Sequence, residues 1–289
     1  MRNSTIYVEG RVMKIIVDSS CDSNIDLLAK EDLKLNYIPF SLLLDDEHII
    51  DDETFEINAY IEKMRKASQI RTAAPSPELY LNEMRGEQDN FVITISSPLS
   101  ASFSNASIAK QMHEDEEGAG KVHVFDSKSA SAGPILIALK INELIKQKIS
   151  FEDITVTVQE YIDSLSTYFV LERYDNLVKN GRINAYVAKA ASILRVKPVC
   201  AEVEGKLAMV DKAMGSSKAL AKIVKRIVED KSVKFEERVL AIGHVRCFDK
   251  AMQLRDDILK HVKFKDAVVV EARGLCTTYA DDGGIIVSY

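Results

Sequence analysis

Cysteine, histidine and glycine are all scarce in this chain of 289 residues. The four cysteines lie far apart without a C-x-x-C pair, which argues against a zinc site, a redox pair or a disulfide framework. The five histidines include no H-E-x-x-H motif, and the twelve glycines form neither G-x-x-x-x-G-K-[ST] nor G-x-G-x-x-G. We therefore expect no metal, no nucleotide and no other cofactor.

An excess of positive charge is also missing. There are 38 Lys and Arg residues against 44 Asp and Glu residues, which gives a net charge of -6. The chain therefore lacks the general excess of positive charge that is typical of proteins that bind nucleic acid. The longest apolar stretches, such as residues 125–144, contain charges and fall short of the roughly 20 apolar residues that a membrane span needs. No secretory signal is visible at the N-terminus, so we expect a cytoplasmic protein.

What the sequence does contain is the balance of an ordinary globular protein, with 46% hydrophobic and 28% charged residues. Apolar runs of strand length alternate with helical periodicity from end to end, which predicts βαβ units around a largely parallel sheet. A chain of this length usually forms two domains or one large one. We place a domain boundary near residue 165.

Two strands are predicted early in the chain, over residues 13–17 and 37–44. An acidic segment follows the second strand. It could bind a divalent cation, but a charged surface hairpin is the favoured interpretation. Its members are Asp45, Asp46, Asp51 and Asp52.

Three predicted strands end in hydroxyl-rich loops that lead into helices. The loops are Asp18-Ser19-Ser20, Ser96-Ser97 with Ser100, and Asp126-Ser127 with Ser129. In an open parallel sheet these loops converge on the carboxyl edge, where ligands bind. Helix N-termini and serine hydroxyls supply hydrogen-bond donors there, which predicts capture of a small anion. The alternative is that each serine only caps its helix.

Catalytic residues are not predicted. The chain has no G-x-S-x-G nucleophile elbow, and none of its histidines lies in a motif that marks it as a general base. A serine hydrolase is therefore poorly supported.

Several short segments, taken in order, resemble the DegV family of bacterial proteins, which is related to the FakB fatty-acid-binding proteins. Each match alone is weak, and their order makes the resemblance specific. The matching segments are MKIIVDSSCD at 13–22, RTAAPSP at 71–77, ISSPLSASF at 95–103, VFDSKSASAG at 124–133, NGRI at 180–183, and KPV at 197–199 with GKL at 205–207. Residues 1–12 then look like an N-terminal extension.

The resemblance implies an α/β protein of two domains. Residues 13–165 would form a three-layer α/β/α domain with a mostly parallel sheet, and residues 166–289 a two-layer α/β domain with a mixed sheet. It implies a non-catalytic carrier that encloses one long-chain fatty acid between the domains and presents the carboxylate to a FakA-like kinase. In that family a Thr and a Ser hold the carboxylate, and these fall on Thr72 and on Ser96 or Ser97.

Two positions depart from the family pattern. Tyr279 falls about where the family has the His of an H-x-G-P-G segment, and its hydroxyl can donate to a carboxylate but adds no positive charge at neutral pH. Met214 stands about where family members often have an Arg implicated in engaging the kinase. Met214 therefore counts against coupling to a kinase.

Three further residues are candidates for the ligand site or the domain interface: Ser19, Ser127 and Arg182. Arg182 follows Gly181 in a predicted C-cap turn that would fix the direction of its side chain, although a lone arginine is usually a surface residue. A last group is predicted to be core or pocket wall. It comprises Phe169, Tyr174, Ile193 and Leu194.

Two other functions stay open at this point. The first is an enzyme that acts on a small anionic metabolite at the same sheet edge, since the family's fold resembles that of dihydroxyacetone kinases. The second is a regulatory module that binds another protein. The missing general base counts against the first, and a large exposed apolar patch would favour the second.

Overall fold

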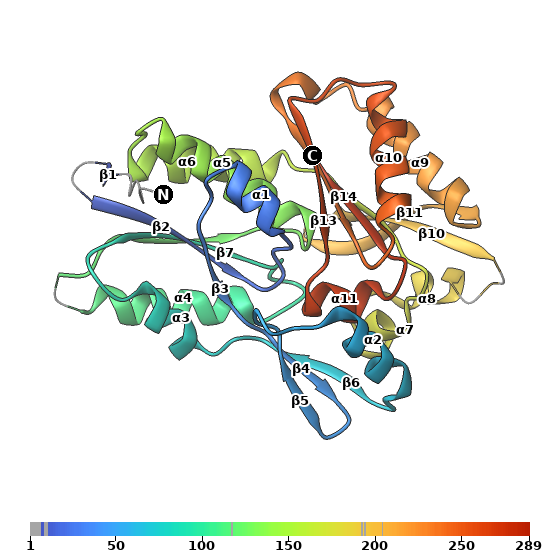
Figure 1. Cartoon of the computed structure of the whole chain (residues 1–289), viewed down its shortest axis with the longest axis horizontal. Helices are drawn as coiled ribbons and strands as arrows, with labels where there is room; N and C mark the ends of the chain where they lie inside the picture. Colours follow the sequence, from blue (N-terminus) through green and yellow to red (C-terminus); the bar gives the residue numbers. More distant parts are fainter. Residues whose placement is uncertain (1–6, 9–10, 117, 192, 194, 204) are drawn as a thin grey trace.

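In the computed structural model, the described residues are 7–8, 11–116, 118–191, 193, 195–203 and 205–289. Their strands form three sheets of five, six and three strands. Figure 1 shows the five-stranded sheet on the left, the six-stranded sheet on the right and the three-stranded sheet below them.

The five-stranded sheet carries the hydroxyl-rich loops. Strand β2 pairs in parallel with β3 and β7, and β7 pairs in parallel with β8, whereas the short β1 is antiparallel to β2. Strand β1 lies in the predicted extension, whose residues 1–6 and 9–10 are outside the described part of the chain. The strands are β1 Tyr7–Val8, β2 Arg11–Asp18, β3 Leu35–Ile38, β7 Asp89–Thr94 and β8 Val122–Asp126.

Helices cover both faces of this sheet, which is why every residue of β7 is buried. Ile16 and Val92 face Tyr80 in α3, while Phe91 faces the opposite cluster that contains Ile135 in α5. These are the three layers that the family resemblance implies. The helices of this half are α1 Ile25–Lys30, α3 Pro77–Met84, α4 Ser102–Glu114, α5 Ala132–Lys146 and α6 Phe151–Asp163.

The six-stranded sheet is mixed, in the order β11-β10-β9-β14-β12-β13. Only the β12–β13 pair among these neighbours is parallel. Helices α9 (Ser216–Glu229) and α10 (Phe248–Leu259) cover one face, so the predicted two-layer arrangement is confirmed. The strands are β9 Thr167–Val170, β10 Val196–Val203, β11 Lys206–Met214, β12 Val239–His244, β13 Asp266–Glu271 and β14 Ile285–Ser288.

The three-stranded sheet corrects one prediction. The segment 37–44 is not one strand: β3 ends at Ile38, and β4 (Ser41–Leu44) begins a different sheet with β5 (Glu47–Ile50) and β6 (Ile70–Ala73). Pro39 separates the two strands, because proline has no N–H to donate to a ladder.

Several short elements complete the chain. They are α2 Ile57–Lys66, α7 Asp175–Lys179, α8 Ala185–Ala191, the 3-10 helix Phe235–Glu237 and α11 Gly274–Ala280. Helix α5 packs against β12 and β14, and α11 packs against α2 and β4, so the two halves of the chain share extensive contacts. The division into domains at residue 165 stays a prediction.

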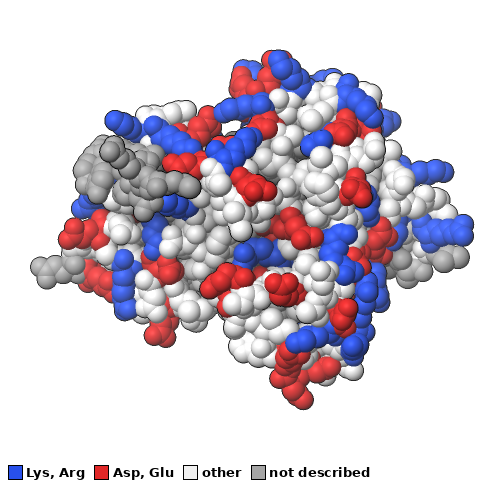
Figure 2. Space-filling model, in the orientation of Figure 1, with Lys and Arg blue, Asp and Glu red and all other residues white. Residues whose placement is uncertain are grey.

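The surface carries mixed charge. Figure 2 shows acidic and basic side chains interspersed over the face that it displays. None of the described helices is long and apolar enough to cross a membrane. The described residues also contain no group of three or more His, Cys, Asp or Glu side chains that could hold a metal ion.

Candidate functional site

A cavity of about 300 Å³ lies between the two larger sheets and α11. Ligand pockets of proteins start at about this volume. Alternate residues of β9 contribute to its wall, because Thr167 and Phe169 point to the same face of the strand. Most of the wall is apolar. The large apolar side chains are Phe40, Ile95, Leu99, Phe169, Leu171, Leu177, Leu207, Leu275 and Ile286.

Two hydroxyls from distant parts of the chain meet in this wall. The Oγ1 atom of Thr72 on β6 lies 2.8 Å from the hydroxyl of Tyr279 on α11. Both side chains line the cavity and are half-buried. The structure thus brings together two of the residues that the sequence predicts for a carboxylate.

Ser96 and Ser97 are placed differently. The Ser96 hydroxyl is buried and donates to the carbonyl oxygen of Gly205 at 2.5 Å. Ser97 is exposed, and its backbone N–H donates to Oδ1 of Asp126 at 3.1 Å. Neither serine is among the residues that line the cavity.

Ser19 and Ser127 are buried and bind backbone groups of loops. The Ser19 hydroxyl accepts from the backbone N–H of Phe40 at 3.1 Å. The Ser127 hydroxyl donates to the carbonyl oxygen of Ser129 at 3.0 Å. Both hydroxyls therefore hold backbone in place and do not face the cavity, which matches the alternative of a structural role.

Asp18 fastens the loops of the sheet edge to one another. Its carboxylate accepts from the hydroxyls of Ser20 and Ser102, each at 2.5 Å, and from the backbone N–H of Ile95 at 2.9 Å. Burial raises the pKa of Asp18, and these hydrogen bonds oppose that rise. This carboxylate fixes the start of α4 against the ends of β2 and β7.

Arg182 lies in the cavity wall and bridges two segments. Gly181 has a φ of +68°, the left-handed conformation of a helix C-cap turn. The guanidinium then donates from Nε to the carbonyl oxygen of Leu99 at 3.0 Å and from Nη1 to that of Asn180. Arg182 therefore joins the end of α7 to the loop after β7.

A second group of hydroxyls lies at the wall. Ser129 comes from one of the predicted anion-binding loops, whereas sequence reasoning missed Thr167 and Ser288. Ser129 Oγ lies 2.8 Å from Thr167 Oγ1, which lies 2.9 Å from Ser288 Oγ. All three are buried, and Ser129 and Thr167 line the cavity. Only the pairing of Thr167 with Ser288 across β9 and β14 brings them together, and no local motif signals that register.

Two other predictions need correction. Asp51 is fully buried and is not part of a surface hairpin. Its carboxylate accepts hydrogen bonds from backbone N–H groups of α11. Ile193 is 53% exposed and so belongs neither to the core nor to the cavity wall. Leu194 lies outside the described residues. Phe169 and Tyr174 are buried as predicted.

The chain belongs to the DegV family, whose model, described as an uncharacterised protein of that family, matches residues 12–289. A DegV domain-containing protein of Streptococcus gordonii is 32% identical over 280 residues, which cover 96% of this chain and 98% of that protein.

Solved structures of similar proteins contain fatty acids. A DegV family protein from Ruminococcus gnavus, refined with vaccenic acid, is 33% identical with a TM-score of 0.90, covering 96% of this chain and 99% of that one. A DegV family protein from Eubacterium eligens, loaded with heptadecanoic acid, is 27% identical with a TM-score of 0.88 over 96% and 99% of the chains. The fatty acid kinase (Fak) B3 protein of Streptococcus pneumoniae, loaded with linoleic acid, is 29% identical with a TM-score of 0.87 over 96% and 98%.

Proposed function

We propose that this protein is a carrier that encloses one long-chain fatty acid in the cavity. The observation that carries the proposal is the Thr72–Tyr279 hydroxyl pair set into a mostly apolar wall. Such a wall suits an acyl chain, and paired donors suit its carboxylate. The similar proteins from Ruminococcus, Eubacterium and Streptococcus that hold fatty acids support the same ligand class.

The carboxylate is proposed to bind at Thr72 and Tyr279. A carboxylate out of water needs several donors. Each of these hydroxyls carries one proton, and one of the two protons now lies in the hydrogen bond between them, so both can donate to a ligand only when that bond opens. Arg182 and Lys128 also line the cavity, together with the acidic Glu202, and Lys128 forms an ion pair with Asp163 at 2.8 Å. The positive charge of Arg182 favours the ionised form of a ligand carboxylate. Ser96 can join this site only if its hydroxyl leaves the Gly205 carbonyl.

The acyl chain supplies most of the binding energy in this proposal. Burying about 14 methylenes is worth about 11 kcal/mol at ~0.8 kcal/mol each. Association costs about 4 to 15 kcal/mol. Tight binding therefore requires that nearly all of the tail leaves water.

The residues that line the cavity favour a carrier over an enzyme. No histidine is among the described residues that line the cavity. The thiol of Cys276 does line it, but burial raises its pKa well above the usual range, so it is no activated nucleophile. We propose that the carrier works in the cytoplasm and presents the carboxylate to a FakA-like kinase, although Met214, 55% exposed, replaces the expected arginine.

Titration of delipidated protein with oleate tests the proposal. Thr72→Val and Tyr279→Phe each remove one hydroxyl, and we expect each to weaken binding about tenfold, because a hydrogen bond to a charged group is worth about 1.5–3 kcal/mol. Tyr168→Phe is the matched control, since Tyr168 faces the α9–α10 side of β9. Absence of oleate binding, or unchanged affinity in both variants, would refute the proposal.

A further inference from the structure

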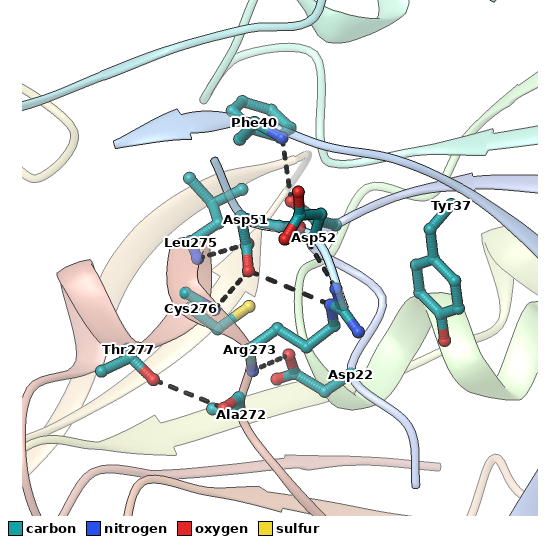
Figure 3. A network of polar contacts seen from close by, with 12 residues as sticks. Asp22, Tyr37, Phe40, Asp51, Asp52, Ala272, Arg273, Leu275, Cys276 and Thr277 are labelled. Atoms are coloured by element: carbon teal, nitrogen blue, oxygen red, sulfur yellow. Dashed lines mark hydrogen bonds and ion pairs between the residues drawn. The ribbon is translucent and has the colours of Figure 1, made fainter. Parts of the chain in front are cut away.

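The first turn of α11 is held by two buried carboxylates from the other half of the chain. The backbone N–H groups of Gly274 and Leu275 each donate to one oxygen of Asp51 at 2.8 Å. The preceding N–H, that of Arg273, donates to Oδ1 of Asp22 at 2.7 Å (Figure 3). Amides that a helix start leaves without partners are thereby satisfied.

Close packing makes the Asp51 contact specific. A Cβ atom at position 274 would lie 2.7 Å from Oδ1 of Asp51 and 2.6 Å from Cδ1 of Leu42, so a larger residue there would displace one of these two buried side chains. The guanidinium of Arg273 lies 4.6 Å from the ring centre of Tyr37, and its Nη2 donates to the Asp51 carbonyl oxygen at 3.2 Å. Figure 3 shows Arg273 beside both Asp51 and Tyr37.

Asp51 is also directly connected to the sheet that carries Thr72. It follows β5, Thr72 lies on β6, and both strands pair with β4, where Leu42 is opposite Thr72. Asp51 therefore ties the start of α11 to the three-stranded sheet, while Tyr279 near the end of α11 meets that sheet at Thr72. The distance from Gly274 to Tyr279 along the helix axis is about 7.5 Å.

We infer that Asp51 is a positioning residue for the fatty-acid site, which sets where the Tyr279 hydroxyl meets Thr72. Helix α11 has only seven residues, and a helix this short is not stable by itself in water. The contacts that hold α11 therefore determine where its side chains lie. The hydrogen bond of 2.6 Å between the hydroxyls of Tyr60 and Thr278 is a second anchor near the other end. The inference rests on the proposed function, because it assigns Tyr279 to the carboxylate.

A double-mutant cycle on oleate affinity tests this inference. Asp51→Asn keeps the size of the side chain but turns an N–H₂ group toward an amide, so we expect about tenfold weaker binding. In a Tyr279→Phe background the same substitution should change the affinity less than twofold, because the Tyr279 hydroxyl, through which Asp51 acts on the ligand, is already absent. An equal loss in both backgrounds would show a general structural effect and overturn the inference.

The chain provides a matched control in the same sheet. The carboxylate of Asp45 accepts from the backbone N–H groups of Ser68 at 3.1 Å and Gln69 at 2.8 Å, away from α11. Asp45→Asn should leave oleate affinity unchanged. If Asp51→Asn does not fold, Asp51→Glu keeps both acceptor oxygens but displaces α11, and the same cycle applies.

The outcomes separate this inference from the proposed function. A wild-type protein that binds no oleate refutes both. Oleate binding that is unaffected by Tyr279→Phe refutes the carboxylate site and the inference built on it. Oleate binding that falls with Tyr279→Phe but not with Asp51→Asn leaves the proposed function intact and overturns the positioning role alone.

Discussion

Asp22 and Asp51 show how much a single residue's surroundings decide its chemistry here. Both carboxylates are buried and bind the start of α11. Burial raises the pKa of Asp51 above its ordinary value, and the nearby Arg273 opposes that rise. Burial likewise raises the pKa of Asp22, to about 7. One member of this pair therefore titrates near neutral pH.

Asp22 should make the stability of the fold depend on pH. In the folded state the Asp22 carboxyl group has a pKa of about 7, whereas in the unfolded chain it has the ordinary pKa of 3.8. Stability should therefore fall as the pH rises between these values, by roughly 2 kcal/mol from about pH 5 to about pH 7. Urea unfolding of the wild type and of Asp22→Asn at both pH values measures this. Equal pH dependence in both proteins would contradict it.

At the scale of elements, the sequence predicts regular strands and helices well and long-range contacts poorly. The parallel strands β2 and β7 are recognisable because each has a short apolar run at its buried centre, residues 15–17 and 91–93. Helix α11 is missed, because it is short and Arg273 at its N-cap makes no side-chain capping bond. Its caps are Asp22 and Asp51, more than 200 residues away.

The candidate site divides in the same way. Thr72 could be proposed through a family resemblance because the segment RTAAPSP marks its position, and Tyr279 because it falls about where the family has a His. The burial of Asp51 and the chain of hydroxyls from Ser129 to Ser288 depend on which strands pair, and that information is not local.

The cavity wall makes its own prediction at this scale. Ala130 lies in the wall, in the loop between β8 and α5, and Ala130→Phe should fill part of the cavity with a ring. We expect oleate affinity to fall more than tenfold while the fold is kept, because the tail loses buried surface. Ala221→Phe on the exposed side of α9 is the control for a surface ring. Calorimetric titration compares the two, and equal affinities would contradict the assignment of the cavity.

At the scale of the whole molecule, the two large sheets meet through α5. The start of this helix lies against β12, where a Cβ atom on Gly243 would be only 2.1 Å from Oγ of Ser131. With Ser131 in place, a side chain at position 243 would therefore displace the Ser131 hydroxyl at the contact between the two halves of the chain.

The contact can be tested by rescue. Gly243→Ala should lower the free energy of unfolding by about 1–3 kcal/mol, the usual cost of overpacking. Adding Ser131→Ala removes the clashing oxygen, and the nearest remaining atom, Cβ of residue 131, would lie 3.4 Å away. Most of the lost stability should then return in urea unfolding experiments. If the double variant loses as much free energy of unfolding as the two single variants together, the result would contradict this packing.

The central claim is that this cavity holds one long-chain fatty acid. Native mass spectrometry of the purified protein, followed by solvent extraction of what it carries, tests that claim most directly. The account predicts added mass of one fatty acid per chain, and the same fatty acid in the extract. A protein without added mass that also takes up neither oleate nor palmitate would contradict it.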